Sequence, residues 1–143
     1  MLSRGDLQIY VKQTEPDYGD IRRVVLSVHG IAGSTEDDIQ TSIAEEMEIF
    51  SSATIRFDFP FHGHSPMDND SFTLENCRLS LLAAAEYAKE QYPEVEDLCI
   101  FATGFGAYVT LIALQELQGS FSPPFEKNLV HPSTLEKPLL SGV

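Results

Sequence analysis

The sequence predicts an α/β fold, a three-layer sandwich in which helices cover both faces of a parallel β-sheet. Two observations carry this prediction. Three short runs, RRVVLSVHG (22–30), ATIRFDFP (53–60) and DLCIFAT (97–103), have the continuous apolar and β-branched character of strands buried on both faces. Helical patterns lie between these runs, and strands that alternate with helices form parallel sheets.

The N-terminal half begins with a half-buried strand over residues 7–13, because apolar and polar side chains alternate in LQIYVKQ. A helix is expected after the strand at 22–30. Ser34 and Asp37 have the spacing of a capping box, and apolar residues follow at helical spacing (Ile39, Ile43 and Met47). The strand at 53–60 is expected to stop at Pro60.

The C-terminal half is expected to hold two helices. Thr73 is the predicted cap of the first, which ends at Tyr92 and Pro93 and carries one apolar stripe (Leu74, Cys77, Leu81, Ala84, Ala85 and Ala88). The second is expected to run from Ala107 to Leu117 and to close at Gly119. We therefore expect one core domain over residues 1–119. Residues 120–143, rich in Pro and Ser and without a clear period, are expected to form an irregular tail in which only FEKNLV resembles a strand.

The composition narrows the classes of partner and compartment. Nine Lys and Arg against 22 Asp and Glu give a net charge of −13, which repels nucleic acid and anionic membrane surfaces. The first residues lack the apolar core of a secretory signal, and no apolar run is long enough to span a bilayer. A cytoplasmic protein is therefore expected, in which Cys77 and Cys99 are buried thiols and not a disulfide.

Three segments together resemble the α/β-hydrolase superfamily, in particular its serine esterases, lipases and aminopeptidases. VVLSVHGIAGS (24–34) resembles the strand and HGxxG loop, and FDFPFHGHS (57–65) resembles the D-x-x-G-H-G-x-S loop, with Phe61 where that pattern usually has Gly. FATGFGAYVTL (101–111) resembles the nucleophile elbow, G-x-S-x-G with small flanking residues. Each segment lies at the end of a predicted buried strand, and the resemblance covers roughly residues 7–117.

The resemblance implies an oxyanion hole made by the backbone N–H groups of Ile31 and Phe105. It assigns structural loop roles to His29, Gly30, Asp58, His62, Gly63 and Ser65. The nucleophile position is Gly104, which has no side chain and cannot form an acyl-enzyme, although glycine suits the strained elbow. Thr103 is the nearest hydroxyl, but a neighbour of the apex is expected to point to another face.

The acid and base of a catalytic triad are also expected to be missing. The superfamily places them after the nucleophile in the order acid, then His. Beyond Gly119 the sequence offers Glu126, Glu136 and His131, and His131 precedes Glu136, the reverse of that order. His131 is thus only a weak candidate for a base. The resemblance implies a truncated serine-hydrolase fold for ester or amide bonds, shortened at the C-terminus, inactive as a pseudoenzyme and without a cofactor.

Two other functions stay open. The same fold could serve as a non-catalytic module that binds an ester, an amide or a carboxylate. A different hydrolytic mechanism could use water with His62, His64 or His131. The pair His62 and His64 also has a spacing found in zinc sites, but the H-x-H-x-D-H pattern is not completed, and no phosphate-loop spacing is present.

The strand at 97–103 is expected to leave an open apolar sheet edge if no further strands follow. We expect the tail, a second copy of the chain, or an exchange of tails between copies to cover that edge, which predicts a homo-oligomer.

Overall fold

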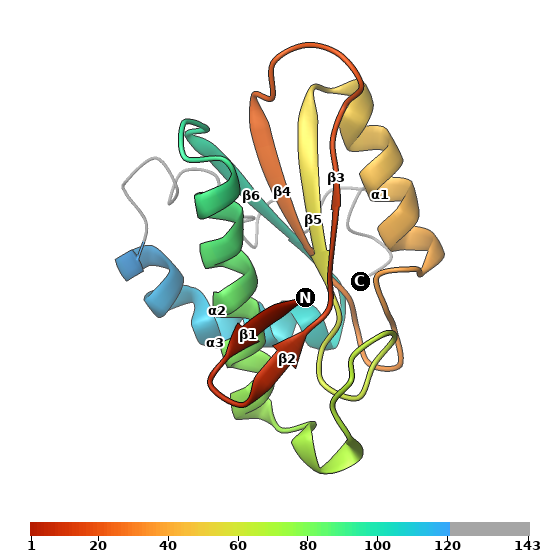
Figure 1. Cartoon of the computed structure of the whole chain (residues 1–143), viewed down its shortest axis with the longest axis vertical. Helices are drawn as coiled ribbons and strands as arrows, with labels where there is room; N and C mark the ends of the chain where they lie inside the picture. The colour runs from red at the N-terminus through yellow and green to blue at the C-terminus, as the bar shows by residue number, and fades with distance from the viewer. Residues whose placement is uncertain (121–143) are drawn as a thin grey trace.

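The structure is a computed structural model that describes residues 1–120, and its elements follow one another as shown in Figure 1. The strands are β1 (Leu2–Arg4), β2 (Leu7–Ile9), β3 (Val11–Thr14), β4 (Arg23–Val28), β5 (Ser52–Phe57) and β6 (Asp97–Ala102). The helices are α1 (Asp38–Ile49), a short 3₁₀ turn η1 (Asn69–Ser71), α2 (Leu74–Gln91) and α3 (Phe105–Ser120).

The main sheet has the strand order β3-β5-β4-β6. Strand β4 pairs in parallel with both β5 and β6, whereas β3 joins β5 antiparallel at one edge. Val28, the last residue of β4, lies opposite Phe57 of β5 and Ala102 of β6. The three parallel strands therefore end level with one another, and the loops that leave them start at the same edge of the sheet.

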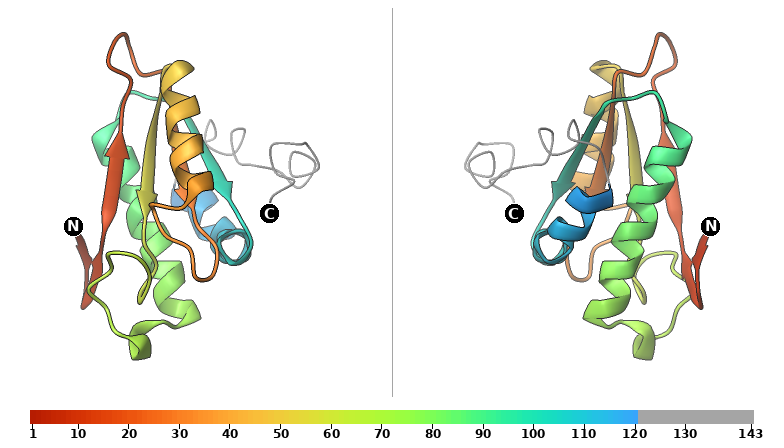
Figure 2. Two further views of the ribbon diagram at one scale, coloured as in Figure 1. Left: turned by 90° about the vertical axis from the view of Figure 1, so that its right-hand side faces the viewer. Right: turned by 90° about the vertical axis from the view of Figure 1, so that its left-hand side faces the viewer.

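The expected three layers are present, as the side views in Figure 2 show. Helix α1 covers one face, where Ile43 packs with Val25 and Phe101. Helices α2 and α3 cover the other face, where the larger core joins them to β4, β5 and β6. The predicted α/β sandwich is thus correct, with the addition of one antiparallel edge strand.

The N-terminal strand differs from the expectation. Residues 7–13 form two strands in different sheets: β2 pairs with β1 in a separate hairpin, and β3 pairs with β5. Gly5, at φ +58°, makes the tight turn between β1 and β2, which glycine adopts without a Cβ penalty. The alternation was correct, because Leu7 and Ile9 are buried, but it ran across a break near Tyr10.

The helix boundaries differ in two places. Helix α1 begins at Asp38 with Asp37 as its N-cap residue; the Asp37 carboxylate accepts the Ser34 N–H (2.9 Å), but residues 35–37 are not helical. The Ser34 hydroxyl also accepts the Glu36 N–H (3.1 Å), so the side-chain contacts of the expected capping box form, but they lie in a turn before the helix. Helix α3 begins at Phe105, before Ala107, and its bounds include Gly119, so Gly119 does not close it.

Other expectations are confirmed. The Thr73 hydroxyl accepts the Asn76 N–H and caps α2, which ends before Tyr92. Cys77 is a buried thiol, as expected, whereas Cys99 is only partly buried. No helix within residues 1–120 combines the length and the apolar character needed to cross a bilayer. The predicted tail, with FEKNLV, Glu126, His131 and Glu136, lies outside the described residues.

Candidate functional site

The elbow between β6 and α3 forms the centre of the site. Gly104 is exposed and has φ +51°, the left-handed conformation that a sharp strand-to-helix turn requires. A Cβ added at Gly104 would meet no atom within 4 Å, whereas one at Gly106 would lie 2.3 Å from the His29 carbonyl oxygen. The space beside Gly104 is thus open, whereas Gly106 must be glycine because α3 lies directly against the end of β4 and the loop after it.

The loop after β4 lies against the elbow through His29 and Gly30. The His29 ring is buried: its Nδ1–H donates to the Gly30 carbonyl (2.6 Å) and its Nε2 accepts the Phe59 N–H (3.0 Å). Burial lowers the pKa of His29, although the hydrogen bond to Gly30 opposes that shift. A Cβ on Gly30 would lie 3.9 Å from the Phe105 backbone nitrogen, so the two loops meet at this point.

Two backbone donors at this junction are unpaired. Within residues 1–120, neither the N–H of Ile31 nor that of Phe105 has a hydrogen-bond acceptor. Phe105 is the first residue of α3, where N–H groups have no partner inside the helix and the helix dipole favours negative charge. Ile31 is 64% exposed, so the junction is open to solvent.

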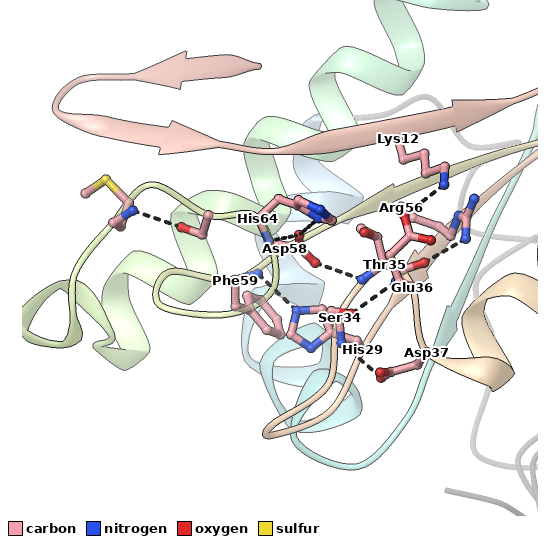
Figure 3. Close-up of polar contacts among 12 residues, drawn as sticks. Lys12, His29, Ser34, Thr35, Glu36, Asp37, Arg56, Asp58, Phe59 and His64 are labelled. Atoms are coloured by element: carbon pink, nitrogen blue, oxygen red, sulfur yellow. Dashed lines mark hydrogen bonds and ion pairs between the residues drawn. The ribbon is translucent and has the colours of Figure 1, made fainter.

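The buried carboxylate of Asp58 ties the loop after β5 to the loop after β4, as Figure 3 shows. It accepts the Thr35 N–H (2.7 Å) and the His64 N–H (2.8 Å). Gly63 must be glycine here, because a Cβ would lie 2.5 Å from the Asp58 carboxylate. Arg56 donates to the Thr35 carbonyl (2.7 Å), so both backbone groups of Thr35 are engaged, which explains why α1 does not begin there.

His62 links the same two loops at the surface. Its Nδ1–H donates to the Pro60 carbonyl (3.0 Å), and its Nε2 accepts the Ala32 N–H (3.1 Å). Because both ring nitrogens are engaged, His62 has no lone pair available for a metal ion. This argues against the hypothesis that His62 and His64 bind zinc. The Ser65 hydroxyl accepts the Met67 N–H (3.2 Å) within the loop.

Aromatic rings pack against one another next to the elbow. The Phe105 ring packs edge-on against Phe59 and Phe72, at centroid distances of 5.6 and 5.7 Å. Phe72 also packs against His62 at 4.8 Å, and Tyr108 of α3 is 54% exposed beside Phe105. Sequence reasoning missed Phe72, which lies in the loop before α2 and carries no motif, and Thr35, whose contribution comes from its backbone.

The structure therefore brings together all but one of the residues predicted for the site. The junction of three loops contains Gly104, Ile31, Phe105, His29, Gly30, Asp58, His62, Gly63 and Ser65. His131 lies outside the described residues. Thr103 is only 9% exposed, in contrast to its exposed neighbour Gly104.

Comparison with solved structures identifies the fold. The chain is similar to the esterase Est1E from Butyrivibrio proteoclasticus in complex with ferulic acid (TM-score 0.72, 20% identity), over 80% of this chain and 46% of that one. It is also similar to XC6422 from Xanthomonas campestris, an α/β serine hydrolase without a lid (TM-score 0.63, 27% identity), over 78% and 51% of the two chains. A third similar structure is mouse α/β hydrolase domain-containing protein 10 (TM-score 0.65, 15% identity; 90% and 45%).

The chain thus spans about half the length of the solved structures that it matches. No family model matches the sequence, and neither does any curated protein.

Proposed function

Because residues 1–120 have the α/β-hydrolase fold, we propose that this protein binds the acyl group of a carboxylic acid or an ester at the elbow without cleaving it. The observation that carries the proposal is the pair of unpaired N–H donors, from Ile31 and Phe105, beside an apex that has no side chain. Such a pair can receive a carbonyl or carboxylate oxygen from two loops at once.

Binding without cleavage follows from the chemistry at the apex. Acyl transfer needs a nucleophile there, and Gly104 supplies none. Within residues 1–120 no histidine is available as a base at the apex: the nitrogens of His29 and His62 are engaged, and His64 lies beside Asp58 and Tyr10. A bound carboxylate would still gain two hydrogen bonds, each worth about 1.5–3 kcal/mol when the acceptor is charged.

The ligand that fits this environment carries an apolar or aromatic group beside its carboxyl. The Phe105 donor belongs to a residue whose ring packs against Phe72, and the Ile31 donor belongs to a residue whose side chain is exposed. The related Est1E structure holds ferulic acid, an aromatic carboxylic acid. The chain's high negative charge opposes polyanionic ligands, which leaves monocarboxylates and neutral esters.

The test is a titration of the protein with butyrate, phenylacetate and ethyl butyrate, followed by amide NMR shifts and by melting temperature. We expect one acid or ester to shift the amide signals of Ile31 and Phe105 and to raise the melting temperature. Phe105→Pro removes the N–H at the first helical position, where proline is well accepted, and Phe105→Ala removes the same ring but keeps the N–H. The proline variant, which keeps only the Ile31 donor, should bind at least about tenfold more weakly than the alanine variant, which keeps both donors.

Two results would contradict the proposal. The first is the absence of any shift across the panel of acids and esters. The second is turnover of an ester by the unaltered chain, because a protein with glycine at the apex should not form an acyl-enzyme.

Strand β6, the last strand of the sheet among residues 1–120, supports a further part of the proposal, a homo-oligomer. Within the described residues β6 pairs only with β4, and its residues 98–102 are apolar. An unpaired apolar edge favours association with another strand. Light scattering with size-exclusion chromatography should show more than one chain per particle, and a monodisperse monomer would contradict this part.

A further inference from the structure

We propose that His62 is a positioning residue of this site, which fixes the loop after β4 so that the Ile31 N–H faces the ligand. The inference rests on the proposed function, since the Ile31 N–H matters only if it receives a ligand. Its structural basis is the hydrogen bond from the Ala32 N–H to His62 Nε2 (3.1 Å), one residue beyond the donor of Ile31.

Backbone strain marks the two ends of this hydrogen bond. Three non-glycine residues within residues 1–120 have positive φ: Ala32 (+59°), Ser51 (+55°) and Phe61 (+65°). Ser51 directly follows the C-cap of α1, where a left-handed residue is common. The other two lie at the donor of the hydrogen bond and immediately before its acceptor, and such conformations persist only where the surroundings hold them.

The orientation of the His62 ring leaves its Nε2 as the acceptor. The hydrogen bond from Nδ1–H to the Pro60 carbonyl (3.0 Å) places the proton on Nδ1. Two rings flank the imidazole, Phe72 at 4.8 Å and His29 at 5.2 Å between centroids. Pro60 and Phe72, both in the loop after β5, thus fix the His62 ring. His62 in turn fixes the Ala32 N–H in the loop after β4.

The turn that carries the Ile31 N–H is held by two hydrogen bonds. The Gly33 N–H donates to the Gly30 carbonyl (3.0 Å), and the Ala32 N–H donates to His62, so the turn at residues 30–33 is fixed around Ile31. Without the acceptor on His62, the turn keeps only the Gly30–Gly33 hydrogen bond, which also forms when the peptide between Ile31 and Ala32 is flipped. Such a flip changes the backbone angles of Ile31, and we infer that it turns the Ile31 N–H away from the ligand.

Two variants of His62 separate positioning from packing. His62→Gln keeps an acceptor at about the distance of Nε2 along the side chain, whereas His62→Asn places its polar group near Nδ1 and leaves the Ala32 N–H without an acceptor. Hydrogen exchange at the Ala32 amide should remain slow in the glutamine variant and become at least about tenfold faster in the asparagine variant. The buried Leu81 amide in α2 is the control for global stability.

Ligand affinity is the second readout, measured with phenylacetate through the Phe105 amide signal. His62→Asn should weaken binding by about tenfold, the factor expected when one hydrogen bond to a charged group is lost, and His62→Gln should restore most of it. If His62→Asn does not fold, replacement of the Ala32 peptide N–H by an ester oxygen removes the same hydrogen bond and leaves both side chains intact.

The outcomes distinguish this inference from the proposed function. If the unaltered protein binds no carboxylate, the proposed function fails, and Ala32 exchange still tests the contact with His62. If Ala32 exchange accelerates but phenylacetate binds as tightly as before, or if both variants behave alike, His62 does not position the donor and the inference is overturned.

Discussion

Gly104 and Gly106, two residues apart in one turn, should respond in opposite ways to a side chain. Gly104→Ser introduces a Cβ into open space, so its only penalty is the left-handed backbone at φ +51°. That conformation costs an ordinary residue about 1–2 kcal/mol, and loss of glycine flexibility in the unfolded chain returns about 0.4–1 kcal/mol. We therefore expect Gly104→Ser to destabilise the protein by about 1 kcal/mol.

Gly106→Ala has the larger predicted effect. Its Cβ would lie 2.3 Å from the His29 carbonyl oxygen and 2.8 Å from that of Val28, both of which are backbone atoms. Alanine favours the helix by about 1 kcal/mol, but relief of this clash requires α3 to move away from β4. Overpacking of this kind costs about 3 kcal/mol or more, so the net change should exceed that of Gly104→Ser by at least about 1 kcal/mol.

Urea unfolding followed by circular dichroism measures both changes in the free energy of unfolding. The comparison requires that the slope of this free energy against urea concentration is the same in the unaltered protein and the two variants. Ester hydrolysis is tested with the Gly104→Ser protein in the same series. We expect none, because the ring nitrogens of His29 and His62 are engaged and His64 lies beside Asp58 and Tyr10. Equal stability of the two variants, or a more stable Gly106→Ala protein, would refute the close approach of α3 to the loop after β4.

Three further predictions concern strain, pH and thiol reactivity. Phe61→Gly should stabilise the protein by about 0.5 kcal/mol in urea unfolding, because it relieves φ +65° at a side chain that is 55% exposed, and Phe61→Ala, which keeps the strain, should not. Burial lowers the pKa of His29, so the unfolded chain binds a proton there more readily than the folded chain does. The free energy of unfolding should therefore keep its full value above about pH 6.5 and fall below that pH by up to about 1.4 kcal/mol per pH unit. A His29→Gln protein should lack this pH dependence. Burial raises the pKa of Cys77 to about 12, so the native protein should leave Cys77 unlabelled by a maleimide at pH 7.5, as mapped by mass spectrometry, whereas the protein in guanidinium should be labelled there.

The central strands could be predicted from the sequence because continuous apolar runs have one stable place in an α/β fold, the buried middle of the sheet. The N-terminal hairpin could not, since three-residue strands such as β1 and β2 are too short to show a period, and a turn at Gly5 interrupts them. The start of α1 was misplaced because Asp58 and Arg56, distant in sequence, engage the backbone of Thr35.

The candidate site was predicted from motifs at the ends of three strands, and the equal ends of β4, β5 and β6 bring those motifs together. The departure at Phe61 has a physical meaning that the sequence did not reveal: the position requires a left-handed residue, which glycine adopts more readily than phenylalanine. The contact between His62 and Ala32 was also hidden, because it joins a side chain to the backbone of a loop 30 residues away.

The central position of β4 also affects how the chain reaches this structure. One neighbour, β5, follows after α1, but the other, β6, arrives only after the whole of α2. Parallel pairing of this kind requires closure of long chain segments before any contact is gained, which slows folding relative to a helical bundle of the same size. During synthesis β4 therefore has one unpaired side until β6 emerges, and in that interval the nascent chain exposes a strongly apolar strand to other chains.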